Sequence, residues 1–188
     1  MKRLKHIGTQ KIETDRLILR KFCESDLQFI YDNWAKDPEN VKYLSWKAHQ
    51  SIEDTRSILD FWLASYDNEN TYNWCIVLKD TGEVIGNINV VEVWNINETC
   101  EIGYVLAKKY WGKGLMPEAA KAVINFLIFK VGFNRVQAKY DTDNPSSGRV
   151  MEKVGMKYEG TLREYCKANS GNWCDAAIYS ILKKDILN

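Results

Sequence analysis

The chain has 188 residues, of which 45% are hydrophobic and 27% charged, the usual balance of a globular protein with one substantial core. Lysines and arginines number 26 against 25 aspartates and glutamates, so the net charge of +1 excludes an overall field that would attract nucleic acid or an anionic membrane. Any anion site must therefore be local. We expect one domain over residues 1–188, with its core from about residue 12 to residue 186.

The sequence contains no segment typical of export or membrane insertion. Residues 1–11 are basic but lack the apolar stretch of a secretory signal. The longest apolar run, 122–129, is interrupted by Asn125 and is far shorter than the ~20 residues that span a bilayer. The five cysteines form no Cys-x-x-Cys motif and mostly lie in strand-like runs, which favours reduced thiols and argues against structural zinc. We therefore expect a cytoplasmic protein.

The first half of the chain predicts a strand, two helices and a β-hairpin. Ser51 with Asp54 three residues later has the spacing of a helix capping arrangement. Asp80 and Gly82 supply turn conformations between two β-rich runs and predict the hairpin. In chain order we expect a strand at 17–20, helices beginning at Ser25 and Ser51, and hairpin strands at 74–78 and 84–91.

The second half predicts alternating strands and helices. Apolar residues at helical spacing over 118–131 predict a helix that packs one stripe on a sheet, and Gly132 ends it. Asn144 with Pro145 behind it predicts the start of another helix. The expected strands are 100–106, 135–141 and a last pair on either side of 169–172. Antiparallel early strands followed by one parallel crossover predict a mixed α/β (α+β) fold.

Gly112 and Gly114 stand between an expected strand and an amphipathic helix. Because glycine has no Cβ, the backbone there can approach an anion closely, and the first N–H groups of the helix point to the same place. This pattern indicates a phosphate cradle and hence a nucleotide-type cofactor. Ordinary turn chemistry explains two glycines equally well.

Four ordered motifs carry a resemblance to a known family. They are the opening 13–20, the Tyr-Trp-Gly-Lys-Gly of 110–114, the Asn-x-x-Ser of Asn144 and Ser147, and the stretch 171–175. Together they resemble the GNAT superfamily of acetyl-CoA-dependent N-acetyltransferases, within it the branch of ribosomal-protein N-terminal acetyltransferases. The resemblance implies a mixed, mostly antiparallel sheet with a splayed parallel strand pair and flanking helices. It also implies acetyl-CoA as cosubstrate, bound between the splayed strands, and no metal.

The resemblance further implies which residues hold acetyl-CoA. The pantetheine arm of acetyl-CoA would run alongside the backbone of Tyr104, Val105 and Leu106 like an added strand, and one N–H there would polarise the acetyl carbonyl. Asn144 would hydrogen-bond a pantetheine amide. Met116 departs from the family's usual small residue. Lys113 suits either a phosphate contact or plain solvent exposure, and Asn144 suits helix capping equally. The implied cofactor-binding residues are Tyr104, Val105, Leu106, Gly112, Lys113, Gly114, Leu115, Met116, Pro117 and Asn144.

Three residues are expected in catalysis. By resemblance Ser147 donates a proton to the departing thiolate, because Met151 stands where many family members have a tyrosine; the alternative is a serine that bonds backbone N–H groups of its own helix. Glu101 is the first candidate for the general base, and its alternative is a solvent-exposed strand residue. Glu164 is a substitute base, since this branch carries glutamate at the position of Cys166 and period-2 geometry places Glu164 on the same strand face.

The acceptor is expected to be an amine, with an N-terminal amine of a protein or peptide as the leading hypothesis. A small-molecule amine such as a polyamine, amino acid or antibiotic is the rival, and a CoA-binding regulatory module without turnover is a third reading. Aromatic residues of the first helices, such as Trp34, Tyr43 and Trp46, fit an acceptor pocket or a core. We expect no nucleic-acid or membrane partner, and homodimerisation is left open.

Overall fold

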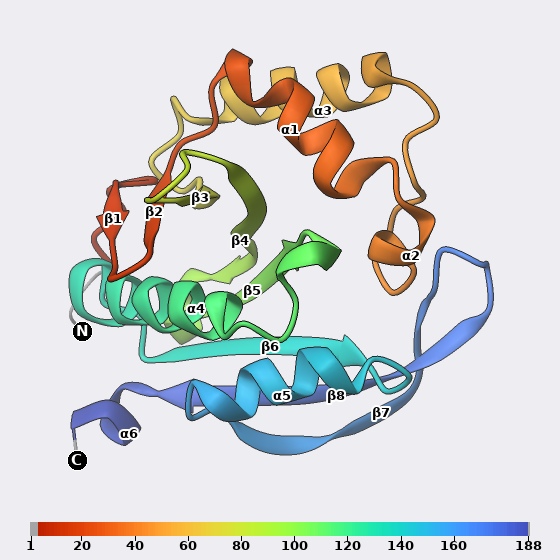
Figure 1. The fold of residues 1–188 in the computed structure, drawn as a ribbon. Helices are drawn as coiled ribbons and strands as arrows, with labels where there is room; N and C mark the ends of the chain where they lie inside the picture. Colours follow the sequence, from red (N-terminus) through yellow and green to blue (C-terminus); the bar gives the residue numbers. More distant parts are fainter. Residues whose placement is uncertain (1–3, 188) are drawn as a thin grey trace.

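The computed structural model describes residues 4–187, which form one sheet with helices on both faces (Figure 1). The strands are β1 (Ile12–Glu13), β2 (Leu17–Arg20), β3 (Asn73–Leu78), β4 (Val84–Trp94), β5 (Thr99–Leu106), β6 (Arg135–Asp141), β7 (Lys157–Lys167) and β8 (Trp173–Leu182). The helices are α1 (Leu27–Ile30), α2 (Pro38–Val41), α3 (Ile52–Ser65), α4 (Leu115–Phe126), α5 (Pro145–Lys153) and α6 (Lys183–Leu187). Across the sheet the strands follow the order β1-β2-β3-β4-β5-β6-β8-β7.

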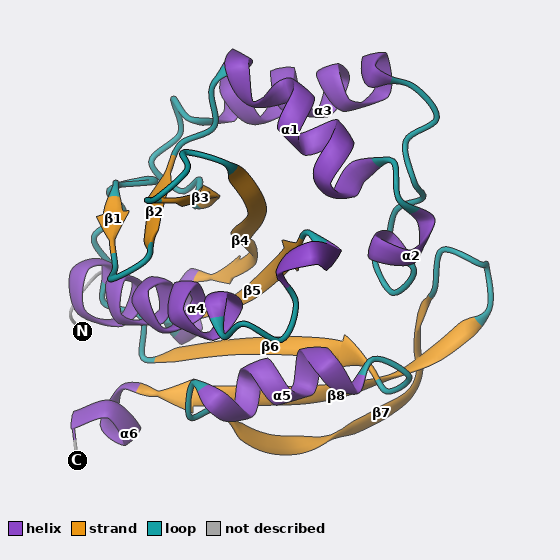
Figure 2. Ribbon diagram, viewed as in Figure 1, coloured by secondary structure: helices purple, strands orange, loops and turns teal. Residues whose placement is uncertain are grey.

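Side chains alternate between the two faces of the sheet and bury a hydrophobic cluster on each. On β3, Trp74 and Ile76 belong to the cluster under α4 and α5, whereas Cys75 and Val77 belong to the cluster under α1 and α3. Figure 2 shows these two helix pairs on opposite sides of the strands. Trp34 is fully buried in the second cluster, so it is a core residue rather than a pocket wall.

Local signals in the sequence define most element boundaries correctly. Ser51 and Asp54 form the expected capping box at the start of α3. The hairpin β3–β4 is confirmed, as is the strand β6. Helix α4 begins at Leu115 rather than at residue 118, and a π-helical turn (Leu127–Val131) carries it to Gly132, whose φ of 104° ends it.

The one parallel pair of strands separates soon after it begins. Strands β5 and β6 pair only over residues 99–101 and 135–137, whereas every other neighbouring pair is antiparallel. Beyond residue 101, β5 stays bonded to β4 and diverges from β6 (Figure 1). This confirms the expected mostly antiparallel sheet with a splayed parallel pair, and it leaves one edge of β5 without a ladder partner inside the sheet.

The last hairpin, β7–β8, is irregular where the sequence predicts a regular strand. The pairing register shifts between Leu162 and Cys166, and Glu164 has a φ of 48°. The expectation that Glu164 and Cys166 share a face by period-2 alternation is therefore wrong, because the alternation does not continue through the bulge. At the hairpin tip, Asn169 donates its side-chain N–H to the carbonyl of Val41 (3.0 Å) and so ties the hairpin to α2.

None of the helices in residues 4–187 combines the length and apolar character that crossing a bilayer requires.

Candidate active site

A cleft of about 440 Å³ lies where β5 and β6 part. One wall is the second half of β5, together with residues of α2 and the turn that follows it. The opposite wall is the end of β6 and the first two turns of α5. The loop before α4 that carries Gly112 and Gly114, called the glycine segment below, also lines the space. Elements separated by about a hundred residues in the chain thus meet at the splayed strand pair.

The free edge of β5 presents backbone groups to this cleft. Ala107 donates its N–H to a carbonyl of β4 (2.8 Å), and because backbone groups alternate sides along a strand, the N–H groups of Tyr104 and Leu106 point away from β4. The Leu106 carbonyl already accepts from Trp111 Nε1 (2.7 Å) and Asn40 Nδ2 (3.2 Å). The open edge therefore consists of two N–H donors, from Tyr104 and Leu106, and the Tyr104 carbonyl.

The glycine segment has the backbone that only glycine adopts readily. Gly112 and Gly114 have φ values of 76° and 75°, in the left-handed region. A Cβ at Gly112 would meet no protein atom within 4 Å, and one at Gly114 would meet only Arg16 Nη2 at 3.6 Å. The space beside both glycines is thus open. Gly114 is also the N-cap of α4 and offers no side-chain partner, which leaves the first N–H groups of the helix unbonded.

The residues next to the two glycines differ in burial and in whether they line the cleft. Leu115 and Met116 line the cleft although their side chains are largely buried in the core, and Pro117 lies in the first turn of α4. The Met116 side chain therefore packs inward. Lys113 does not line the cleft: its side chain is exposed, and its ammonium lies 5.0 Å from the centre of the Tyr110 ring. This placement fits the solvent-exposed alternative for Lys113.

Ser147 lies on the first turn of α5 and lines the cleft. Its Oγ is 2.9 Å from the hydroxyl of Tyr104, which also donates to the Ser147 carbonyl (2.9 Å). The hydroxyl of Ser147 is therefore paired with a tyrosine rather than with backbone N–H groups of its own helix. Burial raises the pKa of Tyr104 well above its usual value, although the bond to Ser147 opposes this, so the phenol stays protonated.

Asn144 precedes α5 and also lines the cleft. Its side chain makes no capping hydrogen bond to the helix. The amide therefore has donor and acceptor capacity available to a ligand, which favours the reading that the family resemblance implies over simple capping.

The two candidate bases lie apart from these residues. Glu101 is 4% exposed and does not line the cleft; one of its oxygens accepts from Lys139 and the other from Gln137 Nε2 (3.0 Å). Lys139 does line the cleft. Burial disfavours its charge, yet the hydrogen bond and charge of Glu101 raise the pKa of Lys139. Glu164 lines a separate hollow on the β7–β8 hairpin, so it is not brought to the cleft.

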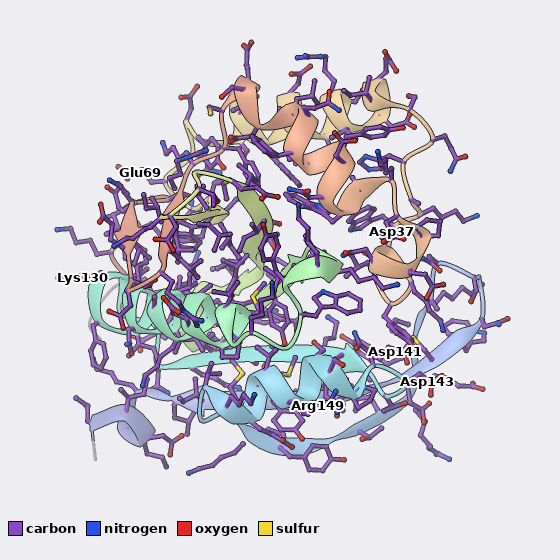
Figure 3. All side chains as sticks on the ribbon, viewed as in Figure 1. Asp37, Glu69, Lys130, Asp141, Asp143 and Arg149 are labelled. Atoms are coloured by element: carbon purple, nitrogen blue, oxygen red, sulfur yellow. The ribbon has the colours of Figure 1, made fainter. Side chains whose placement is uncertain are left out.

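Carboxylates lie on both walls of the cleft, one on α2 and two at the end of β6, and Lys139, Arg149 and Lys153 line the β6 and α5 wall as well. The carboxylates are those of Glu39, Asp141 and Asp143, and Tyr43 adds an aromatic side chain. Figure 3 shows Asp141 and Asp143 at the end of β6, next to the start of α5, with Arg149 further along that helix. These carboxylates are exposed or half-buried.

The distance between α5 and β6 is set by a glycine. A Cβ built on Gly148 would lie 2.7 Å from the hydroxyl and the adjoining ring carbon of Tyr140, closer than real Cβ contacts. The helix can therefore rest on the Tyr140 ring only because residue 148 has no side chain. The same approach fixes the position of Ser147, one residue before.

Sequence reasoning missed three contributors to the cleft. They are the hydroxyl of Tyr104, the amide of Asn40 and the indole of Trp111. The first two bond partners 43 and 66 residues away in the chain, whereas the indole bonds a carbonyl five residues before it. Tyr104 offered a partial signal, since a tyrosine at a strand position facing a cofactor has a polar end that must find a partner. Asn40 offered none, because it lies in a short helix of ordinary composition.

Comparison with known proteins agrees with the geometry. The family model described as "Acetyltransferase (GNAT) domain" matches residues 16–157. The chain is 33% identical over 172 residues to "Uncharacterized N-acetyltransferase YoaA" of Bacillus subtilis, covering 92% of this chain and 96% of that protein. It is 27% identical to the "[Ribosomal protein uS5]-alanine N-acetyltransferase" of Escherichia coli, over 93% and 92% of the two chains. The solved structure of RimL, a ribosomal L7/L12 α-N-protein acetyltransferase in complex with coenzyme A, superposes with a TM-score of 0.82 at 21% identity, covering 92% and 98%.

A splayed strand pair with a glycine segment at the start of the next helix defines an acyl-CoA N-acyltransferase fold. The chain belongs to the GNAT acetyltransferase family, because the family model covers more than half of it. It is an acetyl-CoA-dependent N-acetyltransferase. Two solved structures of the same fold hold CoA and acetyl-CoA, respectively.

Proposed function

We propose that this chain transfers an acetyl group from acetyl-CoA to the α-amino group of a protein or peptide. The observation that carries the proposal is the convergence, on one cleft, of the open β5 edge, the glycine segment and Ser147. Acetyl-CoA supplies the activated acetyl group, carried as a thioester. The residues of the chain supply binding, orientation and proton transfer.

The backbone and Asn144 would hold the cosubstrate. The N–H groups of Gly112, Gly114 and the first turn of α4 suit its diphosphate, because backbone donors at a helix N-terminus stabilise an anion without a side-chain charge. The open N–H and carbonyl groups of Tyr104 and the N–H of Leu106 suit the amides of the pantetheine arm. The Asn144 amide adds a further donor and acceptor.

One N–H of the β5 edge is the proposed donor to the acetyl carbonyl. Negative charge grows on that oxygen as the amine attacks, and a fixed backbone donor stabilises the transition state by about 3 to 4 kcal/mol in comparable enzymes. Leu106 and Tyr104 are the two candidates, since their N–H groups are on the cleft side.

Ser147 is the proposed proton donor to the departing thiolate. The Tyr104 hydroxyl gives its single hydrogen to the Ser147 carbonyl and keeps a lone pair for the serine hydroxyl, so it holds the serine at the cleft wall. When the serine turns its hydrogen to the departing sulfur, the Tyr104 hydroxyl would turn its own hydrogen from the Ser147 carbonyl to Ser147 Oγ, and the tyrosine would recover a proton from solvent. Ser147 and Tyr104 together would thus protonate the departing thiolate, which the Met151 side chain cannot do because it has no proton to donate.

The placement of the carboxylates favours an acceptor that is easily deprotonated. Glu101 is engaged by Lys139 and Gln137, and Glu164 faces another hollow. At neutral pH an α-amino group with a pKa near 8 is unprotonated roughly 200 times more often than a lysine with a pKa near 10.4. An N-terminal amine can thus lose its proton to water, whereas a lysine would need a dedicated base. The identity to the uS5-alanine acetyltransferase supports the same class of acceptor.

A small cationic amine is the second candidate, and the carboxylates of Glu39, Asp141 and Asp143 favour it. Polyamines and similar compounds carry several positive charges that these side chains would bind. Their amines have high pKa values, however, and so need the base that the N-terminal acceptor does not.

Steady-state thiol release with matched acceptors tests the proposal. We expect kcat/KM for a peptide with a free N-terminus to exceed that of the same peptide with a blocked N-terminus and an internal lysine by roughly 100-fold or more. Mass spectrometry should find the acetyl group on the first residue. Equal rates for the two peptides, or turnover confined to polyamines and amino acids, would contradict the N-terminal assignment.

A further inference from the structure

The turn between β1 and β2 reaches the glycine segment through one guanidinium. Arg16 Nη1 donates to the carbonyl of Lys113 (3.0 Å), and Nε donates to Glu118 Oε2 (2.6 Å). The backbone N–H of Arg16 donates to the other carboxylate oxygen of Glu118 (2.9 Å), and so does the hydroxyl of Thr14 (2.6 Å). The Thr14–Arg16 turn therefore links the segment before α4 to the first turn of that helix.

Glu118 accepts hydrogen bonds from both Thr14 and Arg16 and is largely buried. Its side chain is only 18% exposed, and burial alone would raise the pKa of Glu118. The hydrogen bonds from Thr14 and Arg16 outweigh burial and lower that pKa, so the carboxylate is ionised at neutral pH. Arginine suits the site better than lysine would, because its planar fork can bond a carboxylate and a carbonyl at once.

The contact with Lys113 determines which way one peptide group faces. In a trans peptide the carbonyl and the following N–H point in opposite directions. The Lys113 carbonyl points to Arg16, which does not line the cleft, and therefore the N–H of Gly114 points to the other side. Gly114 itself lines the cleft. Glycines on both sides of Lys113 would otherwise let this peptide rotate and present its carbonyl oxygen to an anion.

We propose that Arg16 is a positioning residue for the diphosphate of acetyl-CoA: it holds the 113–114 peptide so that a donor, not an acceptor, faces the phosphate. The inference rests on the proposed role of the glycine segment in holding that diphosphate. Arg16 acts through the backbone of Lys113 and Gly114 and through Glu118. This role explains how an arginine of the opening motif, far from the glycine segment in sequence, contributes to the site.

Calorimetric titration with CoA tests the inference in Arg16→Gln. We expect Kd to rise about tenfold, the effect of one misdirected hydrogen bond to a charged group. Lys11→Gln is the matched control: it removes the same charge from the residue before β1, where Lys11 pairs with exposed Glu13, and should leave Kd unchanged. Arg16→Lys keeps the charge but not the fork, so it should bind CoA as weakly as Arg16→Gln.

Kinetics with two acetyl donors separate positioning from general damage. With acetyl-CoA, Arg16→Gln should raise KM about tenfold and change kcat less than about twofold. With S-acetylpantetheine, which has no diphosphate, kcat/KM should match the parent enzyme. An equal loss with both donors, or parental CoA affinity in Arg16→Lys, would overturn the inference. If Gly114→Ala weakens CoA binding while Arg16→Gln does not, only the Arg16 role fails; if neither variant weakens it, the diphosphate assignment fails as well.

Discussion

The glycine segment makes a quantitative prediction through Gly114→Ala. An alanine held at a φ of 75° in the left-handed region costs about 1 to 2 kcal/mol of folding free energy. The nearest protein atom to the new Cβ is 3.6 Å away, so steric strain within the protein adds little. Relief of the backbone strain would, however, turn the 113–114 peptide, whose N–H is the proposed phosphate donor. Losing one hydrogen bond to a charged group costs about 1.5 to 3 kcal/mol, which is roughly a 10- to 150-fold rise in Kd.

Gly82→Ala provides the matched control. Gly82 has a φ of 70° in the β3–β4 turn, and its Cβ would meet nothing within 4 Å. Thermal unfolding should show a similar loss of stability for both variants, whereas calorimetry with CoA should show weaker binding only for Gly114→Ala. Equal CoA affinity in the two variants would refute the assignment of the diphosphate to this segment.

Three further predictions concern proton transfer and stability. Ser147→Ala should lower kcat by about 100-fold or more with little change in CoA affinity, and Tyr104→Phe should lower kcat by a smaller factor; a Ser147→Ala enzyme with parental kcat would remove the serine from the mechanism. For Glu101→Gln we expect the pH–rate profile to keep its rise near pH ~8, set by the acceptor amine, and a lost or shifted limb would instead identify Glu101 as the base. Asp26→Asn should destabilise the fold by about 3 kcal/mol in urea titrations at pH 7, because it leaves Arg20 without its buried partner. Burial would raise the pKa of Asp26, but the bonds from Arg20 and Cys23 lower it below the unfolded value of about 3.9; its stabilisation is therefore present above that pH and lost as the pH falls, and the variant should lose this acid dependence.

Features of the fold that depend on neighbouring residues were predictable from the sequence. The capping box of Ser51, the turn containing Gly82 and the glycine stop at Gly132 each act within a few residues of their own position. The glycine segment belongs to the same group, since its left-handed conformation is a property of residues 112 and 114 themselves. A pattern read locally is sufficient where the physical cause is local.

Features that depend on distant partners were not predictable in this way. The bulge at Glu164 is supported by Asp175 on the next strand, whose carboxylate accepts the Glu164 backbone N–H (2.8 Å). The pairing of Tyr104 with Ser147 joins β5 to α5. Glu101 has the right place in the sequence for a base, but its carboxylate is bonded by two residues of β6, its register partner Gln137 and Lys139. Each of these partners became visible only with the strand order.

The close approach of α5 to β6 has a consequence for natural variation in this family. Because the Tyr140 ring occupies the volume that a Cβ at position 148 would need, a larger residue at 148 requires a smaller one at 140. The two positions should therefore covary in size among homologous sequences. Large residues at both positions would force α5 away from β6. The serine hydroxyl at position 147 would then lie at a different depth in the cleft.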